Sequence, residues 1–122
     1  MVEIRKGDFS IDEVAAGMRS PEVGAIITYT GTVRQFPGGA GLNFTDRKEA
    51  LQELKQIEKR AVDEFDIADV AIIHRVGFLG ITENILLVAV SAAHREAAFD
   101  ACNSIINEIK GLHKSWQGEV RG

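Results

Sequence analysis

A chain of 122 residues, 45% of them hydrophobic and 26% charged, is long enough for one domain with an apolar core and has the balance of a soluble globular protein. Its net charge of −4 argues against duplex nucleic acid as the main partner, because such binding needs clustered Lys and Arg side chains to neutralise phosphates. The single cysteine, Cys102, excludes an intrachain disulfide, and no apolar leader follows Met1, so we expect a cytoplasmic protein that does not enter a membrane.

The first part of the chain predicts two strands around a short helix. Val2–Arg5 is a strand candidate, and Ser10–Glu13 forms a capping box that should start a helix ending before Pro21. The β-branched stretch Gly24–Val33 predicts a long, mostly buried strand. The glycine-rich stretch Gln35–Gly41 lacks the lysine of a P-loop, and it is interpreted either as a mobile loop beside a site or as a plain connector.

A short strand and a long helix are predicted next. Alternation over Leu42–Thr45 indicates a brief strand, and Arg47–Phe65 has the 3.6-residue period of an amphipathic helix. The residues expected to face inward on this helix are Ala50, Leu51, Leu54, Ile57, Ala61 and Phe65.

The second half of the chain predicts a hairpin of buried strands followed by a helix. Asp69–Val76 and Glu83–Ser91 are apolar strand candidates, and Gly77–Gly80 between them is interpreted as a turn. The last helix is expected over His94–Leu112, with Gly111 as a plausible C-cap. This order of elements indicates a single α+β domain over residues 1–122, built on a mainly antiparallel sheet with flanking helices.

Cationic residues stand at the ends of several predicted elements. His94 and Arg95 open the last helix, where acidic residues are normally favoured; a bound anion would explain them, and the alternative is that Arg95 only pairs with Glu96. Arg34 follows a long strand, and Lys110 and Lys114 stand at the end of the last helix. The residues alone therefore predict an anion-binding site that could also be catalytic.

Metal binding has little support in the sequence. The histidines His74, His94 and His113 lack the spacing of a zinc motif, and one cysteine cannot build a structural zinc site. His74 shares a strand face with apolar residues, which favours a core or interface histidine over a ligand. Cys102 lies on an apolar helix stripe and is interpreted as an inert buried thiol.

Three stretches resemble the large, catalytic subunit of molybdopterin synthase, the MoaE family. They are Gly24–Arg34, Val70–Cys102 and the helix ending in Ile109-Lys110. Gly24–Arg34 resembles the family's G-A-x-x-x-F-x-G-x-V-R strand. Val70–Cys102 resembles both its I-x-H-R-x-G-x-L strand and turn and its S-x-H-R-x-x-A-F strand-to-helix join, and the family's lysine-plus-Trp segment follows.

The resemblance implies a fold of the MoaE-like α/β hammerhead type and a role in molybdenum cofactor biosynthesis. A MoaE homodimer would bind two copies of a small ubiquitin-like sulfur carrier of the MoaD type, giving a heterotetramer. The carrier's C-terminal Gly-Gly thiocarboxylate would supply sulfur to cyclic pyranopterin monophosphate, which forms the dithiolene of molybdopterin. No permanently bound cofactor is implied.

The resemblance also implies roles for single residues. Arg34, His94 and Arg95 would hold the substrate anion, with the His-Arg pair reaching the site of the neighbouring subunit. Lys110 matches the first functional lysine of the family and would act in acid–base chemistry or substrate capture. Trp116 falls in the segment that follows this lysine and is expected to contact substrate.

The sequence departs from the family pattern near its end. The family's second lysine follows its Trp, whereas Gln117 stands there in this chain, and Lys114 is the candidate replacement. The segment after Arg34 is short and lacks the family's acidic-aromatic stretch, and members usually continue beyond the position of Gly122. These departures favour one alternative, a catalytically weakened paralogue that binds or regulates a ubiquitin-like carrier. A second alternative, a generic nucleotide- or phosphometabolite-binding domain, stays open because a fold alone does not fix a function.

Overall fold

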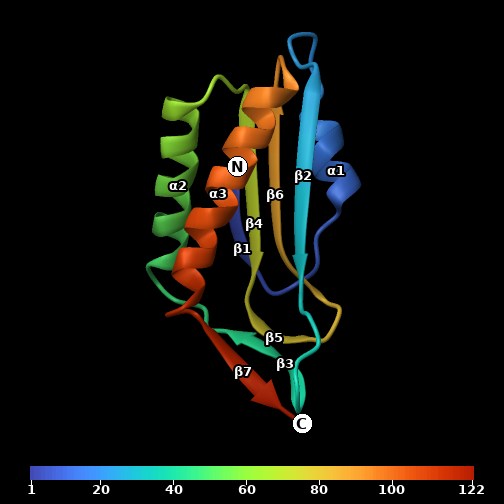
Figure 1. The fold of residues 1–122 in the computed structure, drawn as a ribbon, viewed down its shortest axis with the longest axis vertical. Helices are drawn as coiled ribbons and strands as arrows, with labels where there is room; N and C mark the ends of the chain where they lie inside the picture. Colours follow the sequence, from blue (N-terminus) through green and yellow to red (C-terminus); the bar gives the residue numbers. More distant parts are fainter.

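Two sheets and three helices make up the fold (Figure 1). The computed structural model describes residues 1–122. None of its helices is both long and apolar enough to cross a membrane. The elements are β1 (Val2–Arg5), α1 (Ile11–Gly17), β2 (Ala25–Thr32), β3 (Gly39–Phe44), α2 (Ala50–Glu64), β4 (Asp69–Arg75), β5 (Gly77–Gly80), β6 (Asn84–Ala92), α3 (Arg95–His113) and β7 (Gln117–Arg121).

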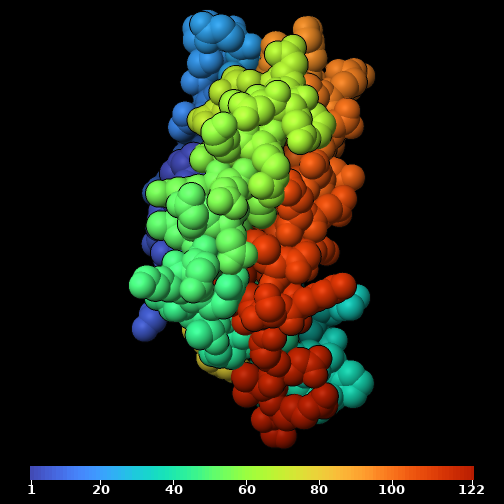
Figure 2. Space-filling view, turned by 90° about the vertical axis from the view of Figure 1, so that its left-hand side faces the viewer, coloured from blue at the N-terminus to red at the C-terminus, as the bar shows by residue number.

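The larger sheet has the strand order β1-β4-β6-β2. Only β1 and β4 run parallel, whereas β4–β6 and β6–β2 are antiparallel. Helices α2 and α3 lie side by side over one face of this sheet, and α1 lies on the other side near β2 and β6 (Figures 1 and 2). The prediction of a mainly antiparallel α+β fold is confirmed.

The central strands β4 and β6 of the larger sheet are more deeply buried than the edge strand β2. The apolar runs of β4 and β6 are buried on both faces, as expected for strands covered by helices and loops. Strand β2 is only half-buried, so the prediction of a mostly buried strand over Gly24–Val33 is wrong in this respect. The reason is its place at the sheet edge, which composition does not reveal.

The helices begin and end close to their predicted limits. Ser10 caps α1, with its Oγ accepting a hydrogen bond from the Glu13 amide at 3.2 Å, and the helix ends earlier than expected, at Gly17. Helix α2 starts at Ala50, and Leu51 is exposed instead of inward-facing because it is rotated about 100° from the buried Ala50 position. Gly111 is not a C-cap, since α3 continues to His113.

The smaller sheet was largely missed by the sequence analysis. Its order is β5-β3-β7, with both pairings antiparallel. Gly77–Gly80 was predicted as a turn but forms β5, and residues 117–121 form the unpredicted strand β7. Both strands are short and are defined by pairing with β3, a non-local interaction that local turn signals cannot report.

One apolar core connects the two sheets. Buried side chains of the larger sheet and of α2 and α3 form a continuous cluster with Phe44, Leu79 and Trp116 from the region of the smaller sheet. Figure 2 shows the C-terminal residues projecting below the paired helices. The smaller sheet is thereby fixed at one end of the larger sheet, close to the last turn of α3.

Two glycines should respond in opposite ways to alanine. A Cβ at Gly41 would lie 2.2 Å from the Leu79 carbonyl oxygen, so Gly41→Ala should disrupt the β3–β5 pairing and destabilise the protein by roughly 2 kcal/mol or more. Gly111 lies within α3 with nothing near its Cβ position, so Gly111→Ala should stabilise by about 0.5–1 kcal/mol. Urea unfolding of both variants checks this, and an unchanged Gly41→Ala protein would contradict the close strand approach.

Candidate active site

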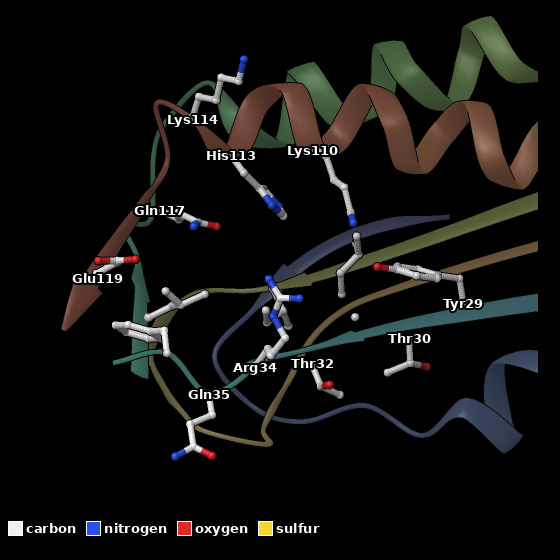
Figure 3. Close-up of a pocket in the computed structure, with 15 residues that line it drawn as sticks. Tyr29, Thr30, Thr32, Arg34, Gln35, Lys110, His113, Lys114, Gln117 and Glu119 are labelled. Carbon is white, nitrogen blue, oxygen red and sulfur yellow. The ribbon is translucent and has the colours of Figure 1, made fainter. Parts of the chain in front are cut away.

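A cleft opens where the end of α3 meets the two sheets (Figure 3). Its volume is about 1000 Å³, and its walls come from β2 and the residues after it, β3, β6, the last turns of α3, and β7. The polar and charged side chains that line it are Tyr29, Thr30, Thr32, Arg34, Gln35, Lys110, His113, Lys114, Gln117 and Glu119.

Arg34 and Lys110 are brought together from distant parts of the chain. The buried Val33 precedes Arg34, and its amide donates to the Glu83 carbonyl at 2.9 Å, which anchors the strand end. Ile109 is fully buried, which fixes the helix face that carries Lys110. Figure 3 shows the Arg34 guanidinium and the Lys110 amine directed into the same space, with the Tyr29 hydroxyl near the amine.

The cleft carries an excess of positive charge although the whole chain is negative. Neither Arg34 nor Lys110 forms an ion pair with a carboxylate of the chain. The only acidic residue lining the cleft, Glu119, pairs with Arg121 at 3.0 Å. Two unpaired cations in a concave site favour an anionic ligand.

The second lysine predicted for the site is oriented differently. Lys114 lines the cleft, but Figure 3 shows its amine pointing away from Arg34 and Lys110. Gln117, the first residue of β7, extends into the cleft in the same view. Gln117 therefore presents a neutral amide to the cleft at the position where the resemblance led us to expect a lysine.

His113 is a cleft residue that the sequence analysis did not select. It lies three residues after Lys110 on the same helix, and this spacing places both side chains on one face. Its Nε2 atom lies 2.9 Å from Nε2 of His74, whose Nδ1 lies 2.7 Å from the backbone carbonyl oxygen of Arg75. The i, i+3 spacing was the available signal, but it gave no reason to prefer a histidine to any other residue.

Burial keeps both histidines uncharged. It lowers the pKa of His74 to about 3, with the neighbouring His113 adding to the effect. It also lowers the pKa of His113 to about 4, assisted by the positive charge of Lys110. Both rings are therefore neutral imidazoles near pH 7.

Trp116 does not line the cleft. It is 3% exposed, its Nε1 donates to the Thr45 carbonyl, and its ring stacks on His74 with centroids 4.1 Å apart. Phe44 packs edge-on against the same tryptophan and both histidines. The predicted contact of Trp116 with substrate is not available to this buried ring, which instead fixes the turn between α3 and β7.

His94 and Arg95 lie at the opposite end of α3 from Lys110. They flank the helix start, and α3 is 19 residues long, or about 28 Å at 1.5 Å per residue. His94 makes no side-chain cap, and the Arg95 side chain is 77% exposed and reaches Glu96 only at 4.0 Å. Within one chain, this pair does not contribute to the cleft.

The structure contains no group of three or more His, Cys, Asp or Glu side chains arranged to hold a metal ion. Cys102 is buried, which raises the pKa of its thiol to about 11. It therefore stays protonated and does not supply a thiolate.

Comparison with known proteins decides the family. A model of the MoaE protein family matches residues 4–111. The chain belongs to the MoaE family. The matched region runs from the end of β1 through most of α3, and it includes Arg34 and Lys110 of the cleft and the His94-Arg95 pair.

Relatives cover most of the chain. The molybdopterin synthase catalytic subunit of Thermoplasma volcanium is 35% identical over 98% of this chain and 90% of its own length. That of Pyrococcus abyssi is 38% identical over 93% of this chain and 79% of its own length.

Solved MoaE structures have the same fold. Molybdopterin synthase from Staphylococcus aureus aligns with a TM-score of 0.86 at 25% identity, covering 98% of this chain and 90% of the other. A complex of subunits 1 and 2 of the molybdopterin-converting factor from Helicobacter pylori aligns with a TM-score of 0.74 at 19% identity, covering 89% and 77%, which shows a shared fold.

The neutral histidines should make stability depend on pH. In the unfolded chain both should titrate near the ordinary histidine pKa of about 6.5, above their folded values. The unfolded state then binds more protons, so stability should fall as the pH is lowered from about 6.5 towards about 4, by at most about 1.4 kcal/mol per pH unit for each histidine.

Urea unfolding at about pH 7 and about pH 5 measures this loss, in a range above the titration of most carboxylates. His113→Gln removes one titrating group and should make the dependence shallower. Equal stability of the unaltered protein at both pH values would contradict the buried, neutral state of the pair.

Proposed function

We propose that this MoaE protein is the catalytic subunit of a molybdopterin synthase, which transfers sulfur from a carrier's C-terminal thiocarboxylate to cyclic pyranopterin monophosphate. The observation that carries the proposal is the cleft in which the unpaired cations Arg34 and Lys110 meet. The two relatives named above are both molybdopterin synthase catalytic subunits and cover nearly all of this chain.

The cleft suits a phosphorylated pterin and a thiocarboxylate. Its volume of about 1000 Å³ is at the upper end for small-molecule sites, which leaves room for a substrate and the end of a peptide. Arg34 supplies a planar guanidinium for a phosphate, since this group matches phosphate oxygens with paired N–H donors. Lys110 is directed into the same space and is the candidate acid–base group.

The partner would be a small ubiquitin-like carrier of the MoaD type. The complex of two subunits in the Helicobacter pylori structure supports a partner of this kind. Strand β7 is an edge of the smaller sheet and contributes Gln117 and Glu119 to the cleft, so an extended tail could pair with its free backbone groups. A Gly-Gly terminus would pass through such an opening without side-chain hindrance.

Lys110→Ala tests the catalytic proposal directly. The purified protein would be mixed with a thiocarboxylated carrier and cyclic pyranopterin monophosphate, and dithiolene formation would be measured. Turnover should fall at least about a hundredfold, the usual scale for losing a general acid–base group, while carrier binding stays nearly unchanged. Lys55→Ala, which removes an exposed lysine of α2, is the charge-matched control.

The outcomes separate the competing functions. Unchanged turnover in Lys110→Ala would remove this residue from the mechanism. Carrier binding without any product from the unaltered protein would instead indicate a silent carrier-binding paralogue. Loss of activity in Lys114→Ala would show that this side chain turns into the cleft and replaces the lysine absent at Gln117.

A homodimer would explain the position of His94 and Arg95. These residues are exposed and far from the cleft of their own chain, so they could enter only a neighbouring subunit's site. If so, Arg95→Ala and Lys110→Ala should each be inactive alone, and a mixture assembled together should recover about a quarter of full activity. Half of the dimers would then be mixed, and each would keep one intact site of two.

Subunit mixing followed by the same assay measures this recovery. As a control, the Arg95→Ala and Lys110→Ala proteins are refolded separately and then combined under conditions in which their subunits do not exchange. Activity of the assembled mixture no higher than that of either variant would contradict a shared site.

A further inference from the structure

One ring nitrogen of His113 faces the cleft without a protein partner. Its Nε2 is engaged with His74, whereas Nδ1 makes no hydrogen bond within the chain. Nδ1 is also not enclosed, since the only buried side-chain polar atoms without partners are Arg47 Nε and Ser91 Oγ. The two nitrogens of an imidazole point in widely separated directions, so Nδ1 is directed away from His74, and the His113 side chain lines the cleft.

The hydrogen bonds fix which nitrogen of each ring carries the proton. The Arg75 carbonyl can only accept, so His74 Nδ1 donates to it and His74 Nε2 is left with a lone pair. His113 must then donate from Nε2 across the 2.9 Å contact. His113 Nδ1 therefore presents a lone pair to the cleft in the unliganded protein.

We propose that His113 is a proton-linked anion-binding residue, which takes up a proton at Nδ1 when a dianion binds beside Arg34 and Lys110. Nδ1–H then donates a charge-assisted hydrogen bond to the anion. The Nε2–H bond to His74 is kept in both states, so protonation needs no rearrangement of the core. The inference rests on the proposed function in taking the dianion to be the phosphate group of the substrate.

The charges around His113 explain why the proton is taken up only with a ligand. Lys110 lies on the same helix face and Arg34 lies across the cleft, and both oppose a further positive charge. Lys114 points away, and the one carboxylate of the cleft, Glu119, is paired with Arg121. A dianion would neutralise the two positive charges and accept a hydrogen bond from Nδ1–H, and both effects raise the pKa of His113 above about 4.

His74 is unsuited to this role, although its ring is part of the same hydrogen-bonded chain. Both of its nitrogens are already engaged, and a proton on Nε2 would face the Nε2–H of His113. It is also fully buried, stacked on Trp116 and edge-on to Phe44. The Arg47 guanidinium lies over the Trp116 ring, 5.4 Å from its centroid. Only His113 therefore exchanges protons with the cleft.

This arrangement compensates for the glutamine at position 117. Figure 3 shows the His113 ring between Lys110 and Gln117. The neutral Gln117 stands where the resemblance to the family led us to expect a second lysine. A permanent third cation is thereby replaced by one that forms only when an anion is present. Affinity for the anion should rise as the pH falls below the pKa of His113 in the complex.

Sulfate binding at two pH values tests the inference. Sulfate remains a dianion from about pH 5.5 to about pH 8, so a change in its affinity reports on the protein rather than the ligand. For the unaltered protein, calorimetric titration should give a sulfate affinity about three- to tenfold higher at about pH 5.5 than at about pH 8. His113→Gln should lose this increase, since its amide can still donate to His74 but does not titrate, while Lys55→Gln should keep it.

Ring nitrogen NMR gives the second measurement. Without sulfate, His74 should carry its proton on Nδ1 and His113 on Nε2; with sulfate, His113 should also become protonated on Nδ1. Three outcomes would overturn the inference. The first is a His113→Gln variant whose sulfate affinity depends on pH as that of the unaltered protein does, and the second is no sulfate binding at all. The third is binding of an adventitious ion only, in which sulfate binds but the His113 signal does not change.

These measurements are independent of turnover. A proton-linked sulfate site in a protein that forms no dithiolene would reject the proposed function and leave the role of His113 standing. If the protein forms dithiolene but the His113→Gln variant binds sulfate with the same pH dependence as the unaltered protein, only the inference about His113 is rejected and the proposed function stands.

Discussion

The contact between His74 and His113 joins the parts of this protein that form the cleft. His74 is on a central strand of the larger sheet, and His113 is the last residue of α3. Phe44, the last residue of β3, and Trp116, which directly precedes β7, pack against the two histidines. This packing holds β3 and the start of β7 against the end of α3. This cluster and the pairing of β7 with β3 together position β7, which forms one wall of the cleft.

Charge is distributed along α3 in a way that separates two tasks. Its C-terminal end carries Lys110 into the cleft, near the dipole end that favours cations. Its N-terminal end exposes Arg95, where the helix dipole disfavours a cation and Glu96 compensates only weakly. A residue with little local stabilisation on a rigid helix is suited to contact another molecule. In the proposed dimer, one helix would serve two sites.

Buried histidines often appear as candidate ligands or catalysts when only their sequence context is known. His74 lies on β4, and its role in this structure is to hold other groups in place through two hydrogen bonds and a stacked ring. Its neutral state matters, because a charged ring at this buried position would lack solvation. The residue in contact with solvent is His113, which depends on His74 for its tautomer.

The sequence by itself determined the elements whose signals are local and the family to which the chain belongs. Periodicity located α2, α3 and the buried strands, and motifs located Arg34 and Lys110. Tertiary structure alone decided that Gly77–Gly80 is a strand, that Trp116 is buried, and that Lys114 points away while His113 lines the cleft. These features depend on contacts between residues far apart in the chain, and no local spacing encodes which partner a short strand or a side chain will meet.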